Sequence, residues 1–254
     1  TRRSSDLDGA FGKKLSLAIA QGLKVVVVHG GGPQINKALS DANIESTFVG
    51  GFRVTTPETF EVVERVLSNE VGPQVAQTLT QSGVAALAIS GRHSGTIFAN
   101  RQQTLVNGDT VDLGLVGTVA RVDAEAIHVL LEKGVVPVIS PIANDLDSDG
   151  GLNVNADIAA AAIAGALHAQ ELIIMTDVPG IYRNWPDRDS LITSIGSQEL
   201  EGIKGTFAEG MAPKVQACLD AIEAGATAVR IIDGTNPSAF ADALAHSGGT
   251  LVVA

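Results

Sequence analysis

Short apolar runs alternate with segments of helical periodicity along most of the chain. Runs rich in Val, Ile and Leu predict strands at residues 23–28, 84–90, 135–140, 171–176, 228–232 and 250–253. Apolar positions three and four residues apart predict helices at residues 9–21, 33–41, 57–81, 124–132, 156–167, 211–224 and 237–245. Apolar strands joined by helices favour a parallel sheet that is covered on both faces. The pattern therefore predicts an α/β fold, a three-layer αβα sandwich with a mainly parallel central sheet.

Three segments interrupt this alternation. Alternating apolar positions around the pair Asn107-Gly108 predict a β-hairpin insertion at residues 105–122. Residues 144–151 are rich in Asp and Gly and predict a polar loop. Residues 183–190, which include Trp185, predict a surface loop.

Composition narrows the classes of partner. The chain has 254 residues, enough for one large α/β domain or two lobes. Its formal net charge of −11 argues against nonspecific binding to nucleic acid or an acidic membrane, because no basic surplus can displace counterions. Cys218 is the only cysteine, which excludes an internal disulfide and a cysteine-based metal cluster. No apolar run reaches the length of about 18 residues typical of a membrane span, and we predict a cytoplasmic protein.

The segment His29-Gly30-Gly31-Gly32-Pro33 lies where a predicted strand passes into a predicted helix. Glycines lack Cβ, so they can adopt positive φ and let a phosphate or carboxylate approach backbone N–H groups at the helix start. The spacing matches neither the dinucleotide fingerprint nor a Walker A loop, and no Gly-x-Ser-x-Gly elbow of an esterase is present. Two interpretations stay open: an anion-binding turn of another kind, or a tight turn without a ligand.

Polar clusters also follow other predicted strands or precede helices, where ligands gather in open α/β sheets. In the segment Asn153–Asp157, Asp157 is either a helix cap or first-turn carboxylate, or a functional group. The segment Thr176–Gly180 is either a plain turn or part of a binding site. In the segment 210–214, Lys214 falls in the first turn of a helix, where it opposes the helix dipole unless an anion lies nearby. A solvated lysine is the alternative.

These clusters belong to six motifs that follow one another in a fixed order. They are Val28-His29-Gly30-Gly31-Gly32-Pro33-Gln34-Ile35, Gly51-Phe52-Arg53-Val54-Thr55, Gly114-Leu115-Val116-Gly117, Asn153-Val154-Asn155-Ala156-Asp157, Thr176-Asp177-Val178-Pro179-Gly180 and Gly210-Met211-Ala212-Pro213-Lys214. From about Leu23 to Asp233 the chain thereby resembles the amino acid kinase family, and within it the members that phosphorylate N-acetyl-L-glutamate.

The resemblance implies transfer of the γ-phosphoryl group of ATP to the side-chain carboxylate of N-acetylglutamate. It implies that the backbone N–H groups of Gly31 and Gly32 hold the transferred phosphoryl group and the attacking carboxylate. Arg53 would bind the α-carboxylate through its planar fork, and Asn153 would bind the acetylated amino acid. Asp157 would orient the catalytic lysine or lysines.

The implied nucleotide site includes a cation for the transferred group. Its positions are Thr176, Asp177, Gly180, Gly210, Met211 and Lys214. Lys214 would offset charge on the phosphoryl group, and Mg²⁺ would be held through the ATP phosphates rather than by a protein metal site. The resemblance also implies two lobes, residues 1–169 for acyl-amino-acid binding and dimerisation and residues 170–254 for the nucleotide, in a homodimer.

Three departures from the family pattern qualify this hypothesis. Nothing before Leu23 matches the family's opening strand with its Lys-x-Gly-Gly turn, and we expect that residues upstream of this sequence supply it. Residues 68–72 lack the family's usual Gly and Asn positions, so no role is assigned to them. The segment His246–Thr250 keeps only part of the signature of arginine-inhibited members, which favours an arginine-insensitive enzyme. A kinase for an aminoadipate side chain and a non-catalytic ligand sensor stay open as alternatives.

Overall fold

The computed structural model describes residues 9–106, 109–207 and 211–254. The described residues up to Ala159 form one compact unit, and Ala160–Ala254 form a second. The predicted α/β class and the mainly parallel strand pairing are confirmed. None of the described helices is long and apolar enough to cross a membrane.

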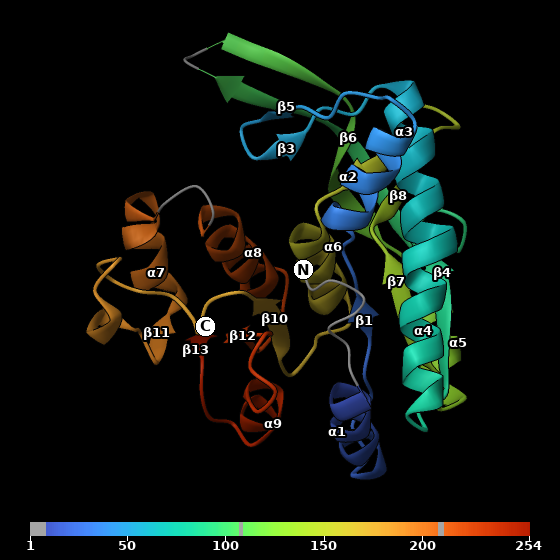
Figure 1. The fold of residues 1–254 in the computed structure, drawn as a ribbon. Coiled ribbons are helices and arrows are strands. Elements are labelled where there is room, and N and C mark those ends of the chain that lie inside the picture. The colour runs from blue at the N-terminus through green and yellow to red at the C-terminus, as the bar shows by residue number, and fades with distance from the viewer. Residues whose placement is uncertain (1–8, 107–108, 208–210) are drawn as a thin grey trace. The chain divides into compact units, whose positions relative to one another are not determined.

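A parallel sheet and its helices form most of the first unit. Strands β1 (Val27–Val28), β7 (Val136–Ser140) and β4 (Ala86–Ser90) pair in that order. The helices are α1 (Gly9–Ala20), α2 (Gly32–Asp41), α3 (Pro57–Glu64), α4 (Gly72–Gln81) and α5 (Glu125–Glu132). Figure 1 shows β4 and β7 beside α4. The observed strand β1 is shorter than the strand predicted at residues 23–28. Among the described residues of this run, only Val27 and Val28 pair with a neighbouring strand.

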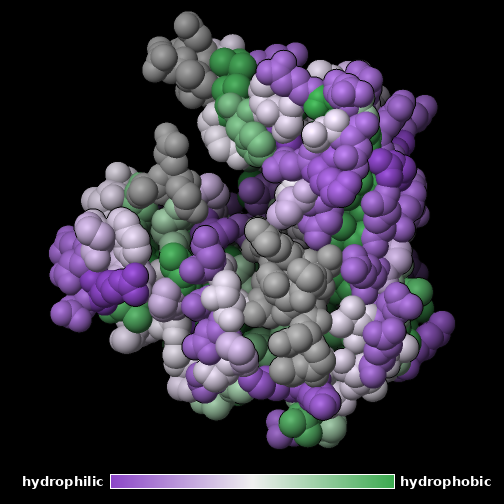
Figure 2. Space-filling view, viewed as in Figure 1, coloured by the Kyte–Doolittle hydropathy of each residue, from purple (hydrophilic) through white to green (hydrophobic). Residues whose placement is uncertain are grey.

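One long helix was predicted at residues 57–81, and the structure confirms its extent but not its uniformity. Between α3 and α4 the chain forms a π-helical stretch, Arg65–Val71, which we call the π segment. The N–H of Gly72 bonds to the carbonyl of Leu67, five residues back. The exposed positions of α3 and α4 are mainly polar, and Figure 2 shows hydrophilic residues over this face. Their buried face includes Val63, Val75 and Leu79, each at most 2% exposed.

Two further β structures belong to the first unit. A short hairpin joins β2 (Phe48–Val49) to β3 (Phe52–Arg53). A small closed barrel contains β5 (Ile97–Val106), β6 (Asp109–Val122), β9 (Gly151–Val154) and β8 (Ile142–Asp145). The pairing of β5 with β6 confirms the predicted hairpin insertion, while its turn residues Asn107 and Gly108 lie outside the described residues.

The barrel corrects two boundaries of the sequence prediction. The hairpin begins at Ile97 and not at Leu105, because the polar run at residues 100–103 lies in β5 and pairs largely with β6. The predicted polar loop at residues 144–151 is also shorter, because Asn144 and Asp145 belong to β8 and Gly151 to β9. Backbone pairing satisfies the amides of these polar residues, so side-chain polarity alone does not mark a loop.

The motif at residues 114–117 owes its glycines to close backbone approach. Gly114 has φ +73°, and a Cβ there would lie 2.3 Å from the carbonyl oxygen of Thr55. Thr55 bonds to both neighbours of this glycine, accepting from the N–H of Leu115 at 2.7 Å and donating its own N–H to Leu113 at 2.9 Å. At Gly117 a Cβ would lie 2.9 Å from the Cβ atoms of two barrel residues. Gly114 therefore lets the barrel reach the segment that carries Arg53, and Gly117 allows close packing inside the barrel.

The second unit contains a four-stranded sheet. Its order is β10 (Leu172–Thr176), β12 (Ala228–Asp233), β13 (Thr250–Val253) and β11 (Ser194–Gly196), with β12 and β13 antiparallel. The helices α7 (Ser197–Ile203), α8 (Ala212–Glu223) and α9 (Ala239–Leu244) belong to it, and α6 (Ala156–Ala166) begins in the first unit and ends here. Its core includes Ile181, Leu200, Val229 and Val252, each fully buried. Neither β11 nor α7 was predicted, because each is too short to show a clear period.

Candidate functional site

The glycine turn lies between β1 and α2, as the sequence predicted. Gly31 is the N-cap of α2, and no hydrogen bond from its N–H is found within the described part of the chain. The N–H of Gly32 belongs to the first turn of the helix, where intrahelical partners are lacking. Two adjacent amides at the positive end of a helix thus remain available for an anion.

The reason for glycine in this turn differs from the one first expected. None of the three glycines has positive φ; Gly31 has φ −176°, an extended conformation. A Cβ at Gly31 would instead lie 2.7 Å from Cδ2 of Leu67 and 3.3 Å from Cγ2 of Val71 in the π segment. At Gly32 a Cβ would meet no described atom within 4 Å, so protein packing does not exclude a side chain there. Packing against the π segment therefore explains why residue 31 is a glycine. At residue 32 packing gives no such reason, and close approach of a ligand would account for the glycine.

Arg53 is placed by the β2–β3 hairpin. Gly50 and Gly51 have φ values of +56° and +83°, the conformation that two-residue hairpin turns require, and Arg53 faces Phe48 across the ladder. Its guanidinium donates to Oδ1 of Asn36 at 2.7 Å and to the hydroxyl of Ser46, and its Cζ lies 4.6 Å from the Phe48 ring centroid. These three partners are neutral.

Burial leaves this cation without a compensating charge. Arg53 is 8% exposed, and desolvation by burial lowers the pKa of its guanidinium from the ordinary value. No carboxylate of the described residues forms an ion pair with it. Arg230, which is 3% exposed, shows the usual arrangement: its Nε lies 2.6 Å from Oε1 of Glu171, and Nη1 donates to the carbonyl of Gly248. A buried arginine with only neutral partners is arranged to receive an anion.

Asn153 is connected to Arg53 through Thr55. The amide of Asn153 donates to Oγ1 of Thr55 at 3.3 Å, and that hydroxyl donates to the carbonyl of Arg53 at 2.9 Å. Asn36, the other partner of the guanidinium, lies on α2, the helix that begins at Gly32. The structure thus brings the glycine turn, Arg53 and Asn153 into one set of connected elements. Sequence analysis assigned no role to Asn36, whose position shows no local signal, or to Thr55.

Asp157 lies in the first turn of α6, and its neighbour caps the helix. Oδ1 of Asn155 accepts the N–H of Asp157 at 2.8 Å and that of Ile158 at 3.4 Å. Asp157 is therefore a first-turn carboxylate, and the helix-cap interpretation applies to Asn155 instead.

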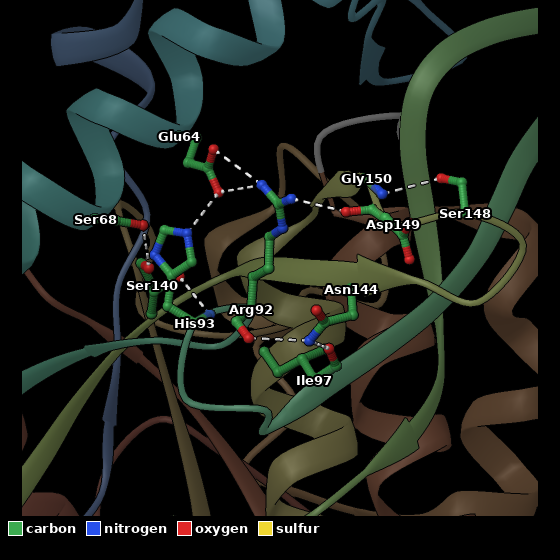
Figure 3. A network of polar contacts seen from close by, with 11 residues as sticks. Glu64, Ser68, Arg92, His93, Ile97, Ser140, Asn144, Ser148, Asp149 and Gly150 are labelled. Atoms are coloured by element: carbon green, nitrogen blue, oxygen red, sulfur yellow. Dashed lines mark hydrogen bonds and ion pairs between the residues drawn. The ribbon is translucent and has the colours of Figure 1, made fainter.

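A polar network fixes the loop that leads into β9 (Figure 3). Nη1 of Arg92 contacts both carboxylate oxygens of Glu64, at 3.0 and 3.2 Å, and Nη2 donates to the carbonyl of Asp149. Asn144 donates to the carbonyl of Arg92 at 3.0 Å. In the same view Ser68 of the π segment bonds to Ser140 at the end of β7, with the hydroxyl oxygens 2.9 Å apart. The network connects helix α3 to the loop before the strand that carries Asn153.

In the second unit, the first three predicted nucleotide positions lie at the end of β10 and in the turn after it. Thr176 is buried and donates to Oδ1 of Asp177 at 3.1 Å, whereas Asp177 is exposed. Thr176 pairs in register with Asp233, and its carbonyl accepts the N–H of Gly234 at 2.7 Å. A Cβ at Gly180 would lie 2.4 Å from Oγ1 of Thr250, so this glycine is required by packing.

The remaining positions lie at the start of α8. Met211 is the N-cap residue and packs partly against the core of this unit, and Gly210 lies outside the described residues. Lys214 is in the first turn, where its N–H bonds to the carbonyl of Met211 at 3.0 Å. In the parts of the chain that the structure describes, no group of three or more His, Cys, Asp or Glu side chains could hold a metal ion.

The fold defines an α/β protein in which the glycine turn at the start of α2 and the buried Arg53 suit small anionic ligands. Comparison with known proteins identifies the family of this α/β protein. The chain belongs to the amino acid kinase family, whose model matches residues 9–233. It is 45% identical over 256 aligned residues to the acetylglutamate kinase of Kineococcus radiotolerans, covering 98% of this chain and 85% of that protein. The acetylglutamate kinase of Paenarthrobacter aurescens is 46% identical over 243 residues, covering 92% and 77%. A solved structure, smu.665 from Streptococcus mutans UA159, is 28% identical with a TM-score of 0.74, covering 92% and 87%.

Proposed function

We propose that the chain transfers the γ-phosphoryl group of ATP to the side-chain carboxylate of N-acetyl-L-glutamate, in arginine biosynthesis. One oxygen of the carboxylate forms the new bond to phosphorus, and the bond between phosphorus and the bridging oxygen of ADP breaks. The products are N-acetylglutamyl 5-phosphate and ADP. The family, together with the name that relatives 45% and 46% identical carry, supports this assignment.

The buried Arg53 is the observation that carries the proposal. A guanidinium with neutral protein partners can bind the α-carboxylate of the acceptor with two parallel hydrogen bonds. Asn153, connected to Arg53 through Thr55, is placed to bind the acetylated amino group. The acceptor would then lie beside the start of α2, because Asn36 connects Arg53 to that helix.

The amides of Gly31 and Gly32 would hold the attacking carboxylate and the transferred phosphoryl group. The attacking group is already ionised at neutral pH, so the reaction needs no general base. The open space beside Gly32 and the free N–H of Gly31 within the described chain support this role. Fixed amide dipoles stabilise negative charge without reorganisation, which is the main source of catalysis in phosphoryl transfer.

The second unit would bind the nucleotide through Thr176, Asp177, Gly180, Gly210 and Met211. Lys214 would neutralise charge on the transferred phosphoryl group, and Asp157 would orient the catalytic lysine. Mg²⁺ would be held through the ATP phosphates, since it needs few protein ligands, and it would supply positive charge that neutralises the phosphates. A homodimeric state, a cytoplasmic location and the two-lobe division of labour stay predictions.

The proposal is tested by trapping the acyl phosphate as a hydroxamate. We expect ATP-dependent hydroxamate formation with N-acetylglutamate, and formation at least about tenfold slower with glutamate, aspartate or aminoadipate at equal concentration, because these acceptors lose one or more of the site's polar contacts. Reactions without ATP or without acceptor serve as controls.

Two outcomes would contradict the proposal. Faster reaction with aminoadipate than with N-acetylglutamate would favour the related aminoadipate kinase. Binding of N-acetylglutamate with no hydroxamate from any acceptor would favour a non-catalytic ligand sensor.

A further inference from the structure

His29, the first residue of the glycine turn, contains a buried ring that the reaction does not use. The residue is 8% exposed, and its Nδ1 lies 3.0 Å from the carbonyl oxygen of Gly30. Its Nε2 has no hydrogen-bond partner among the described residues. The ring is therefore engaged at one nitrogen only, and that nitrogen contacts the backbone of the turn itself.

The contact assigns the proton on the ring. A carbonyl oxygen can only accept, so Nδ1 carries the hydrogen and donates it to Gly30. Burial lowers the pKa of His29, and this effect exceeds the opposing effect of the hydrogen bond to Gly30. The ring is therefore neutral at neutral pH, with Nδ1 as the donor and Nε2 unprotonated.

The start of α4 lies against the ring. A Cβ at Gly72, the first residue of α4 after the π segment, would lie 3.1 Å from Nε2 and 3.2 Å from the carbonyl oxygen of Leu67. Leu67 and Val71 also pack against Gly31, which follows the carbonyl that His29 contacts. The π segment thus borders the peptide that the ring bonds to, and the residue that follows it borders the ring. π-helical turns inside α-helices are frequent at functional sites.

The hydrogen bond from His29 to the carbonyl of Gly30 also determines where the N–H of Gly31 points. In a planar trans peptide, the carbonyl of Gly30 and the N–H of Gly31 point in opposite directions. Holding the carbonyl toward the buried ring therefore directs the N–H of Gly31 away from it. Glycines rotate more freely than other residues, so an unrestrained Gly30-Gly31 peptide could turn this donor away.

We propose that His29 is a positioning residue for phosphoryl transfer, which fixes the Gly30-Gly31 peptide so that the amide of Gly31 faces the reacting anions. This inference rests on the proposed function. It assigns to His29 no contact with substrate and no transfer of a proton. Its effect is indirect: the oriented N–H of Gly31 would stabilise the negative charge that develops during phosphoryl transfer.

The test compares three variants that differ in where an N–H can be placed. His29→Asn places an amide N–H where Nδ1 lies, His29→Gln places it near the position of Nε2, and His29→Leu removes it. We expect His29→Asn to keep kcat within about threefold of the unmodified protein. Because loss of one such donor lowers kcat by about 10²–10³, we expect a fall of at least about 30-fold for the other two variants. KM for ATP should stay within about twofold.

A matched control and a stability measurement separate positioning from folding. His128→Leu changes an exposed histidine on α5 and should leave kcat unchanged. Thermal unfolding midpoints are measured for all variants. If His29→Leu does not fold, the comparison of His29→Asn with His29→Gln decides, because both bury an amide.

The outcomes separate this inference from the proposed function. If the unmodified protein forms no acyl phosphate, the proposed function fails. If it does, and His29→Gln or His29→Leu keeps normal kcat, the positioning role is wrong. Equal losses in His29→Asn and His29→Gln would also overturn it, because the position of the donor would then not matter.

Discussion

Replacement of Lys214 by alanine is expected to lower kcat by about 10³-fold or more. The arginine finger of GTPases, a well-placed cation that stabilises charge on the transferred phosphoryl group, contributes about 10³–10⁵ in rate. Lys214 occupies the first turn of α8, where a lysine opposes the helix dipole and gains from a bound anion. Initial rates at saturating ATP and acceptor measure the effect.

The matched control is Lys204→Ala in the same unit. Lys204 is 43% exposed and pairs with Glu201, an arrangement typical of a surface ion pair. Its replacement should leave kcat within about twofold, because such pairs contribute little. Near-normal turnover in Lys214→Ala would show that this lysine does not act on the transferred phosphoryl group.

Replacement of Arg53 by alanine is expected to raise KM for the acceptor by about 10²-fold, with a smaller change in kcat. Hydrogen bonds to charged groups contribute about 1.5–3 kcal/mol each, and about 1.4 kcal/mol corresponds to a factor of ten. The loss should fall on acceptor binding, because Arg53 would contact the non-reacting α-carboxylate. KM for ATP should be unchanged in the same assay.

Arg121→Ala is the control for this variant. The Cζ of Arg121 lies 3.8 Å from the ring centroid of Phe98, so Arg121 makes the same type of cation–π contact that Arg53 makes with Phe48. Its side chain, however, is 54% exposed. Acceptor KM should not change when it is replaced. A fall in kcat with unchanged acceptor KM in Arg53→Ala would place Arg53 outside the acceptor site.

Hydrophobic periodicity predicted the regular elements well where each element has one apolar face or one buried run. The helix at residues 57–81 illustrates both the strength and the limit of this method. Its amphipathic pattern fixes where the helix begins and ends, yet one turn of i→i+5 bonding barely changes the spacing of buried residues. The π segment, which packs against Gly31, therefore left no mark in the pattern.

Elements that depend on distant partners could not be predicted in the same way. Residues 100–103 read as polar, but β6 supplies partners for most of this part of β5 and keeps it extended. The site shows the same limit. The motifs nominated Gly31, Arg53 and Asn153, whereas the connecting roles of Thr55 and Asn36 became visible only through contacts that span 98 and 17 residues of sequence.

The most direct test of the account is a crystal structure with N-acetylglutamate and a non-hydrolysable ATP analogue bound. We expect ligand oxygens at about 2.7–3.2 Å from the backbone nitrogens of Gly31 and Gly32, and the acceptor's α-carboxylate on the guanidinium of Arg53. A glycine turn directed away from both ligands, or an Arg53 that binds neither, would contradict it.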